Sequence, residues 1–177
     1  MAAPGWRAWL AGGALLAGAA VGAPAQSTPE YQAKVILMDK LTRFVDWPGG
    51  AAPRDAFVLA VLGRTPFGED LDAYFSSRPL KDRPVVINYL SRAGDLGACD
   101  LVFVCASEKP RLAAILERLK GRPVLTVADT EGFAQAGVMV GLVREGSRIG
   151  FEVNLAAARE AGFRMAPGFL QLAKIVP

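Results

Sequence analysis

The 177-residue chain has 20 Lys and Arg residues, 17 Asp and Glu residues, no histidine and a formal net charge of +3 at pH 7. The lack of histidine excludes the commonest general base, the commonest zinc ligand and the Ser-His and Cys-His nucleophilic pairs. The charges are scattered, with no basic block and no stripe of aromatic and basic residues, which argues against nucleic-acid binding. No serine lies in an S-x-x-K or G-x-S-x-G setting, so we expect no enzymatic activity, no metal site and no cofactor.

The first 25 residues have the pattern of a secretory signal peptide. Met1 to Arg7 carries the amino terminus and one arginine, residues 8–21 are apolar and uncharged, and Ala23 to Ala25 form a small-residue cleavage site. The apolar stretch is short for a bilayer span, and an uncleaved anchor is the alternative. We expect residues 1–25 to be removed and residues 26–177 to form a single exported α/β domain, which is large enough to bury a core without disulfides or metal.

After this leader, the hydrophobic patterns alternate between helices and strands. Thr28 and Pro29 suit a helix start, and the apolar run at 57–62 is typical of a strand buried on both faces. The Glu145-Gly146 pair suits a tight antiparallel hairpin, and Asn154 can cap the helix that follows it. In chain order, the predicted elements are helix 28–44, strand 57–62, helix 67–75, strand 85–90, strand 101–105, helix 107–119, strand 123–127, a short helix 133–135, strands 138–143 and 147–153, helix 155–161 and a helical segment 167–175.

This alternation predicts an α/β fold, a three-layer sandwich in which helices flank a mostly parallel sheet with an antiparallel C-terminal hairpin at one edge. Ligands of such open sheets bind at the carboxyl ends of the strands, where Arg64, Ser107 and Asp129 follow three of the predicted strands. The alternative is that Thr65, Ser107 and Asp129 cap helices, and we take it as the main role of these residues.

The chain contains only two cysteines, Cys99 and Cys105. A strand between them places their Cα atoms on the order of 20 Å apart, whereas a disulfide requires about 7 Å or less. The sequence therefore predicts two thiols that are not joined to each other, with Cys105 buried as a small hydrophobe.

The segment 148–154 alternates at period two, with Ile149, Phe151 and Val153 on one side and Glu152 and Asn154 on the other. Glu152 is either a solvated surface residue or part of a pocket that binds a polar partner. An arginine 12 residues later, Arg164, can form a bidentate pair with it, clamp a ligand together with it, or make a purely structural salt bridge. The candidate binding residues are Arg43, Asp46, Trp47, Glu152, Asn154 and Arg164, of which Trp47 is either a contact aromatic or a core residue.

Two motifs at these positions resemble the YfiR family of small exported proteins. The first helix ends in Arg43-Phe44-Val45-Asp46-Trp47-Pro48, and the late strand reads Phe151-Glu152-Val153-Asn154-Leu155. Shorter matches lie between and after them, at 61–63, 66–68, 123–127, 132–133 and 170–173, so the resemblance covers essentially the whole chain after the leader.

The resemblance implies a periplasmic regulator that binds the periplasmic sensor part of an inner-membrane diguanylate cyclase and holds it inactive, thereby controlling cyclic-di-GMP synthesis. It also implies a homodimer and an outer-membrane lipoprotein partner that sequesters the repressor. Glu152 and Arg164 are implied to be pocket residues for a small polar ligand or a partner, with residues 43–48 nearby.

The chain departs from the family pattern at two places. Ala60 stands where relatives often carry a cysteine opposite Cys99, which removes a stabilising disulfide, and Ala166-Pro167 stands where some relatives place a histidine. Two other functions remain open: a periplasmic small-molecule binding module for another envelope sensor, such as a histidine kinase, and an envelope hydrolase.

Overall fold

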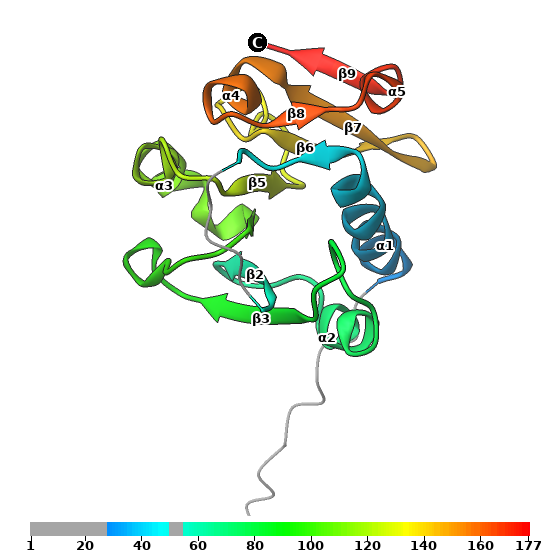
Figure 1. Ribbon diagram of the computed structural model, residues 1–177. Coiled ribbons are helices and arrows are strands. Elements are labelled where there is room, and N and C mark those ends of the chain that lie inside the picture. The colour runs from blue at the N-terminus through cyan, green and yellow to red at the C-terminus, as the bar shows by residue number, and fades with distance from the viewer. Residues whose placement is uncertain (1–27, 50–54) are drawn as a thin grey trace, which may run out of the picture.

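The computed structural model describes residues 28–49 and 55–177. Within these residues, seven strands form one mixed sheet with helices on both faces (Figure 1). The predicted leader, residues 1–25, lies outside the described residues. The strands, in spatial order, are β3 (Val85–Leu90), β2 (Phe57–Leu62), β4 (Leu101–Val104), β5 (Leu125–Ala128), β6 (Val140–Glu145), β7 (Arg148–Asn154) and β9 (Ala173–Val176).

Strands β2 to β6 run parallel, β7 runs antiparallel to β6, and β9 pairs in parallel with β7. The predicted α/β class, the mostly parallel sheet and the antiparallel hairpin are therefore confirmed. The hairpin does not form the edge of the sheet, however, because β9 pairs with the outer side of β7. A separate antiparallel pair, β1 (Val45–Asp46) with β8 (Arg164–Met165), was not predicted.

The helices lie on the two faces of this sheet (Figure 1). Helices α1 and α2 lie on one side of the sheet, and α3 lies on the other. Their bounds are α1 Pro29–Arg43, α2 Asp70–Phe75, α3 Leu112–Leu119, α4 Leu155–Glu160 and α5 Pro167–Leu170, with short 3-10 helices at η1 (Ala93–Asp95) and η2 (Ala106–Arg111).

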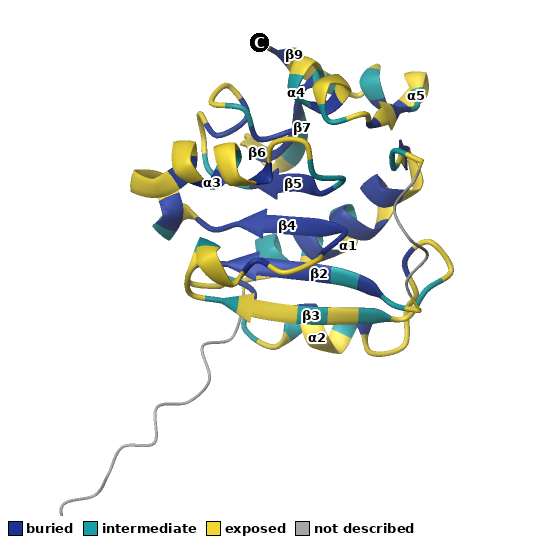
Figure 2. Ribbon diagram, turned by 60° about the vertical axis from the view of Figure 1, so that its left-hand side comes forward, coloured by how far each residue is buried: buried dark blue, intermediate teal, exposed yellow. Residues whose placement is uncertain are grey.

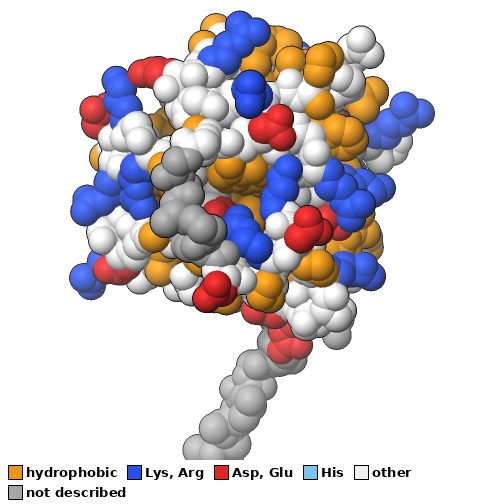
Figure 3. All heavy atoms as spheres, in the orientation of Figure 1, with side chains coloured by type: hydrophobic (Ala, Val, Ile, Leu, Met, Phe, Trp, Pro, Cys, Tyr) orange, Lys and Arg blue, Asp and Glu red, His pale blue; other side chains and the backbone are white. Residues whose placement is uncertain are grey.

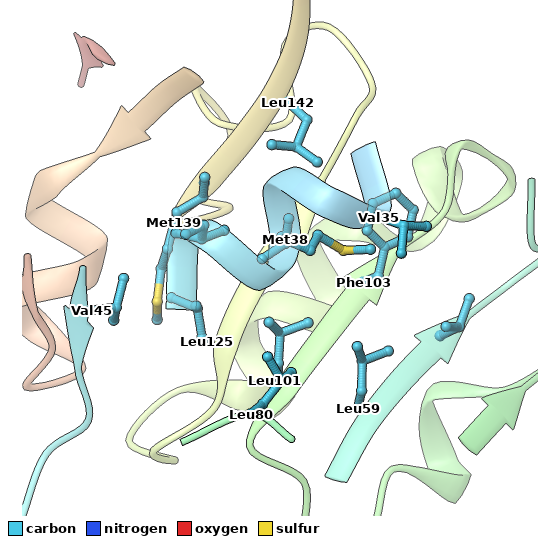
Figure 4. Close-up of a cluster of buried hydrophobic side chains, with 14 of the residues drawn as sticks. Val35, Met38, Val45, Leu59, Leu80, Leu101, Phe103, Leu125, Met139 and Leu142 are labelled. Carbon is cyan, nitrogen blue, oxygen red and sulfur yellow. The ribbon is translucent and has the colours of Figure 1, made fainter. Parts of the chain in front are cut away.

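The central strands are buried because both of their faces are covered by helices (Figure 2). On the α1 side, Met38 of α1 packs among side chains of the sheet that include Leu101 and Phe103 (Figure 4). On the α3 side, Val102 and Val104 pack with Ile115 of α3. Full burial of side chains of this size stabilises the fold by about 1.5 to 3 kcal/mol each.

Four predicted helical segments differ from the structure. In the predicted helix 107–119, the 3-10 helix η2 comes first and the α-helix α3 begins only at Leu112. Helix α2 begins at Asp70 rather than at residue 67, and residues 131–137 form turns instead of a short helix. The predicted helix 167–175 is correct only for α5, because residues 173–176 form strand β9. In that last segment, pairing with the open edge of β7 overrides the local helix propensity, which is a weak preference compared with tertiary contacts.

The two cysteines are buried as thiols, as the sequence predicts. Burial, together with the charges of Asp129 and Glu108, raises the pKa of Cys105 to about 12. Cys105 therefore behaves as a small core hydrophobe. No helix among the described residues combines the length and apolar character needed to cross a bilayer.

Candidate functional site

Arg43, Asp46, Trp47 and Arg164 come together where the parallel strands begin. Arg43 ends α1, and Asp46 of β1 is the register partner of Arg164 of β8. The chain after β8 stays attached to the end of α1 because the Ala166 N–H donates a 2.8 Å hydrogen bond to the carbonyl oxygen of Phe44. The sequence grouped these four residues with Glu152 and Asn154, and the structure brings the four together.

Trp47 is the anchor of this corner and is half-buried. Its ring meets Phe57 and Phe163 edge to face, with centroids 5.6 and 5.7 Å away. Its indole N–H donates a 2.9 Å hydrogen bond to the carbonyl oxygen of Asp100, just before β4. Trp47 therefore has a packing role, and we name Trp47, Phe57 and Phe163 the aromatic corner.

A turn that the sequence did not reveal places two cations over the aromatic corner. Lys81 and Asp82 have φ angles of 49° and 59°, and an isolated bridge joins Leu80 to Arg83 around them, as in a type I′ turn. The Lys81 ammonium lies 5.4 Å from the Trp47 ring centroid, and the Arg83 guanidinium lies 5.1 Å from that of Phe57. The usual signal for such a turn is Asn-Gly or Asp-Gly, and this chain has Lys-Asp instead.

Beside this turn is a cavity of about 390 Å³ that contains charges of both signs. Its lining includes Asp39, Arg43, Lys81 and Asp82. The Arg43 guanidinium is 3.5 Å from the Asp39 carboxylate, and its side chain is 71% exposed, so this ion pair holds it weakly. The other oxygen of Asp39 accepts a 2.9 Å hydrogen bond from Tyr74, whose pKa is raised by burial and by Asp39.

Several candidate charges of this corner face solvent. Arg43, Asp46 and Arg164 are exposed, and the structure gives neither Asp46 nor Arg164 an ion pair within the described residues. The space-filling view shows Lys and Arg side chains around a hollow in the middle of one face (Figure 3). Exposed charges of this kind are available to a partner, whereas charges already paired in the interior are not.

Glu152 has a different environment. It is buried, with 6% of its surface exposed, and its carboxylate accepts hydrogen bonds from Gln135 at 3.0 Å and from Lys174 of β9 at 2.9 Å. The hydrogen bond to Glu152 and the charge of Glu152 raise the pKa of Lys174. Opposite Glu152 on β6 stands Gly141, where an added Cβ would lie 3.5 Å from the Glu152 Cβ.

Asn154 caps α4, as predicted, and also ties two other segments together. Its Oδ1 accepts a 2.9 Å hydrogen bond from the Ala157 N–H, and its Nδ2 donates to the carbonyl oxygens of Ala134 at 2.9 Å and Pro177 at 2.6 Å. Asn154 is 5% exposed, so these bonds satisfy a buried amide.

The structure therefore divides the predicted constellation in two. Phe163 and Met165 belong to the same core cluster as Val153, on the α1 side of the sheet, and Glu152 and Asn154 point to the opposite face because side chains alternate along β7. Within the described chain, Glu152 forms its ion pair with Lys174 and none with Arg164. The partners Gln135 and Lys174 lie 17 and 22 residues from Glu152 along the chain, and only knowledge of the tertiary fold would have identified them.

The carboxyl ends of the parallel strands carry a second polar cluster. Asp129, which follows β5, forms a 2.8 Å ion pair with Lys34 of α1, and both side chains are at least nine-tenths buried. Lys34 also contacts Glu30 at 2.6 Å, and Glu30 contacts Arg144 at 3.4 Å. Burial, the charge of Asp129 and a hydrogen bond to it raise the pKa of Tyr31.

The predicted helix caps at Thr65, Ser107 and Asp129 are wrong. The Thr65 hydroxyl accepts a bond from the Phe67 N–H within a turn, and the Ser107 hydroxyl accepts one from the Arg64 N–H at 2.9 Å. Gly63, with φ +100°, makes this close approach feasible, since an added Cβ would lie 2.4 Å from the Ser107 hydroxyl oxygen. Asp129 is held instead by its long-range pair with Lys34, which local sequence does not reveal.

Among the described residues, no group of three or more Cys, Asp and Glu side chains is placed to hold a metal ion. The comparison with solved structures concerns the fold alone. A solved structure from Streptococcus pneumonia, titled as the ABC domain in complex with L-Trp, shares the fold with a TM-score of 0.57 at 12% sequence identity. The match covers 84% of this chain but only 60% of that protein, so the chain spans less than two thirds of its length.

The family comparison is more specific. The model of the YfiR/HmsC-like family matches residues 31–174, a range that includes all six candidate residues. The resemblance that the Arg43 to Pro48 and Phe151 to Leu155 motifs suggested thus extends over most of the chain. This protein belongs to the YfiR/HmsC-like family, whose members are periplasmic, non-catalytic regulators of cyclic-di-GMP signalling.

Proposed function

We propose that this protein binds the periplasmic sensor domain of an inner-membrane diguanylate cyclase and represses it. The observation that carries the proposal is the solvent-facing set Arg43, Asp46 and Arg164 around the aromatic corner, in a chain whose family regulates cyclic-di-GMP signalling. Arginine and aromatic residues are enriched in protein interfaces and among the residues that contribute most to binding energy.

Rigidity supports this choice of surface. Trp47 is fixed by its ring contacts and by its hydrogen bond to Asp100, and β1 and β8 hold Asp46 and Arg164 in register. A partner that binds here meets a fixed ring and an ordered backbone, so binding orders only the exposed side chains, which limits the entropic cost of association. Glu152 and Asn154 contribute indirectly in this proposal, because they fix β7, β9 and α4 behind the surface.

Binding of the mature protein to an immobilised cyclase periplasmic domain tests the proposal. The R43A/R164A double variant should bind at least about tenfold more weakly, corresponding to about 1.4 kcal/mol, because two partner-facing guanidinium groups are lost. In cells it should raise cyclic-di-GMP. The matched control is R118A, which removes an exposed arginine from α3 on the other side of the sheet. Equal binding by wild type and double variant would remove the corner from the interface.

The family resemblance supports two further proposals about assembly. We propose that the protein works as a homodimer, and that an outer-membrane lipoprotein withdraws it from the cyclase. Mass measurement in solution tests the first, and competition between the lipoprotein and the cyclase domain for the mature protein tests the second.

The second candidate function is a periplasmic small-molecule binding module for another envelope sensor, such as a histidine kinase. The observation that favours it is the cavity beside Arg43 and Lys81, whose volume of about 390 Å³ falls in the range of small-ligand sites. A panel of small anions and zwitterions should then raise the melting temperature of the wild type but not of R43A. Binding to the cyclase domain, with no compound of the panel raising the melting temperature, would favour the cyclase-repressor function.

A further inference from the structure

Strand β9 is a short edge strand that buries little of its side-chain surface. It is four residues long and pairs with β7 alone in the described chain, and among its residues only the Val176 side chain is buried. Leu172, just before the strand, is 75% exposed, and Ile175 within it is 48% exposed. Hydrophobic side chains gather at the end of the molecule where α5 and β9 lie (Figure 3). Short edge segments of this kind open at low free energy.

The sequence of β9 also has a second local conformation available. Residues 167–175 have the pattern of one continuous helix, and Gln171, Leu172, Ala173 and Lys174 are all good helix formers. In the structure the helix stops at Leu170, and a turn at residues 171 and 172 leads directly into the strand. Disagreement between local propensity and fold is concentrated at strained or functional segments. A detached β9 therefore has a helical state to enter, which lowers the cost of detachment.

The outer edge of β7 specifies the chemistry of the segment that pairs with it. Glu152 accepts a hydrogen bond from Lys174, and the Asn154 amide donates to the carbonyl oxygen of Pro177. Opposite Phe151 the register places the small residue Ala173. The edge thus fits a parallel strand that presents a small residue, a cation and two aliphatic residues in that order.

We propose that this edge is a strand-acceptor site, and that its alternative occupant is β9 of a second copy of this chain. The segment of a second copy has the required chemistry by identity, so reciprocal exchange reproduces every β7–β9 contact in a two-fold dimer. The two-residue link after α5 favours such exchange, because a short hinge relaxes when the strand leaves its own chain. This dimer requires no cyclase and does not depend on the proposed function.

A reciprocal charge reversal tests the exchange with mature protein. E152K and K174E each place like charges side by side when β9 pairs with its own chain, and also in an exchanged homodimer. An exchanged heterodimer of the two variants restores an opposite-charge pair at both sites. We expect the mixture to form a one-to-one heterodimer by native mass spectrometry, whereas each variant alone stays monomeric. The E152K/K174E double variant, which restores the pair within one chain, is the control for folding.

Cysteine pairs test the same exchange without charges in the sheet, in case E152K does not fold. Val153 and Ile175 are register partners across β7 and β9. The V153C/I175C double variant should form a disulfide within one chain, which shows that the positions can bond. A mixture of V153C and I175C single variants should give a mixed disulfide dimer between chains. A mixture without that dimer, when the double variant does bond internally, overturns the proposal, as does a folded E152K plus K174E mixture that remains monomeric.

Discussion

The corner around Trp47 and the polar face of β7 contain similar residue types in very different environments. Arg43, Asp46 and Arg164 lie at the surface with weak ion pairs or none in the described chain, whereas Glu152 and Asn154 are at least nine-tenths buried with their polar atoms bonded. A buried polar group stabilises the fold only while its partners remain, and an exposed charge contributes little to stability but is free to bind. Similar residues therefore support the fold in one region and recognition in the other.

Removing the Asn154 amide should give the largest loss of stability. N154A deletes the α4 cap and the two donated bonds, and it leaves the buried Ala134 carbonyl with the Gly137 N–H as its remaining donor. We expect the free energy of unfolding to fall by about 3 kcal/mol, measured by urea denaturation. N154D keeps the cap acceptor but places a buried carboxylate oxygen against the two carbonyl oxygens, so its loss should be at least as large. A change below about 0.5 kcal/mol for N154A would contradict the structural role.

Glu152 should show an intermediate effect. E152A removes a buried carboxylate with two partners, but Lys174 is exposed and returns to solvent, so we expect a loss of about 1 to 2 kcal/mol. The same urea titration measures it. Partner binding per folded molecule should stay within about twofold of wild type, since the side chain does not face the corner. Lost binding with unchanged stability would place Glu152 in the recognition region instead.

Removing the Arg164 side chain should weaken partner binding without changing stability, which is the reverse of the result expected for Glu152. R164A should change the free energy of unfolding by less than about 0.5 kcal/mol, because the side chain is exposed and makes no ion pair in the described structure. It should nevertheless weaken binding to the cyclase sensor domain. Calorimetric unfolding and a binding titration on the same preparation separate the effects on stability and on binding. A destabilised R164A protein that binds normally would show that Arg164 supports the fold and not recognition.

The smallest expected effect concerns pH and the partly exposed Glu30. A hydrogen bond from Lys34, aided by the charges of Lys34 and Arg144, lowers the pKa of Glu30 from its ordinary value of 4.5. A lowered folded-state pKa stabilises the fold above 4.5, and this contribution is lost as the pH falls through the lowered value. E30Q should therefore be less stable than wild type at about pH 7 and should converge with it in strong acid. If the free energies of unfolding of wild type and E30Q differed by the same amount at every pH, the charge of Glu30 would not be the cause of the difference.

Local patterns in the sequence predicted much of the fold. Continuous apolar runs identified β2 and β4, and the tight hairpin and the Asn154 cap were correct because each depends on neighbouring residues. The hairpin loop is Gly146-Ser147 rather than Glu145-Gly146, because Glu145 still pairs with Arg148. Features set by distant contacts were missed. The β1–β8 pair joins segments over 100 residues apart, and β9 is a strand only because β7 offers it an edge.

Local motifs likewise predicted only part of the candidate site. The motif residues 43–47 and Arg164 were found together, whereas the Lys81 turn and the partners of Glu152 depend on the tertiary fold.

The most direct test of the central claim is a binding titration of the mature protein against the periplasmic domain of the diguanylate cyclase. The wild type and R118A should bind equally, and R43A/R164A should bind at least about tenfold more weakly while unfolding at the same temperature as wild type. Failure of the wild type to bind, or undiminished binding by a folded R43A/R164A protein, would contradict the claim that the corner around Trp47 is the recognition surface.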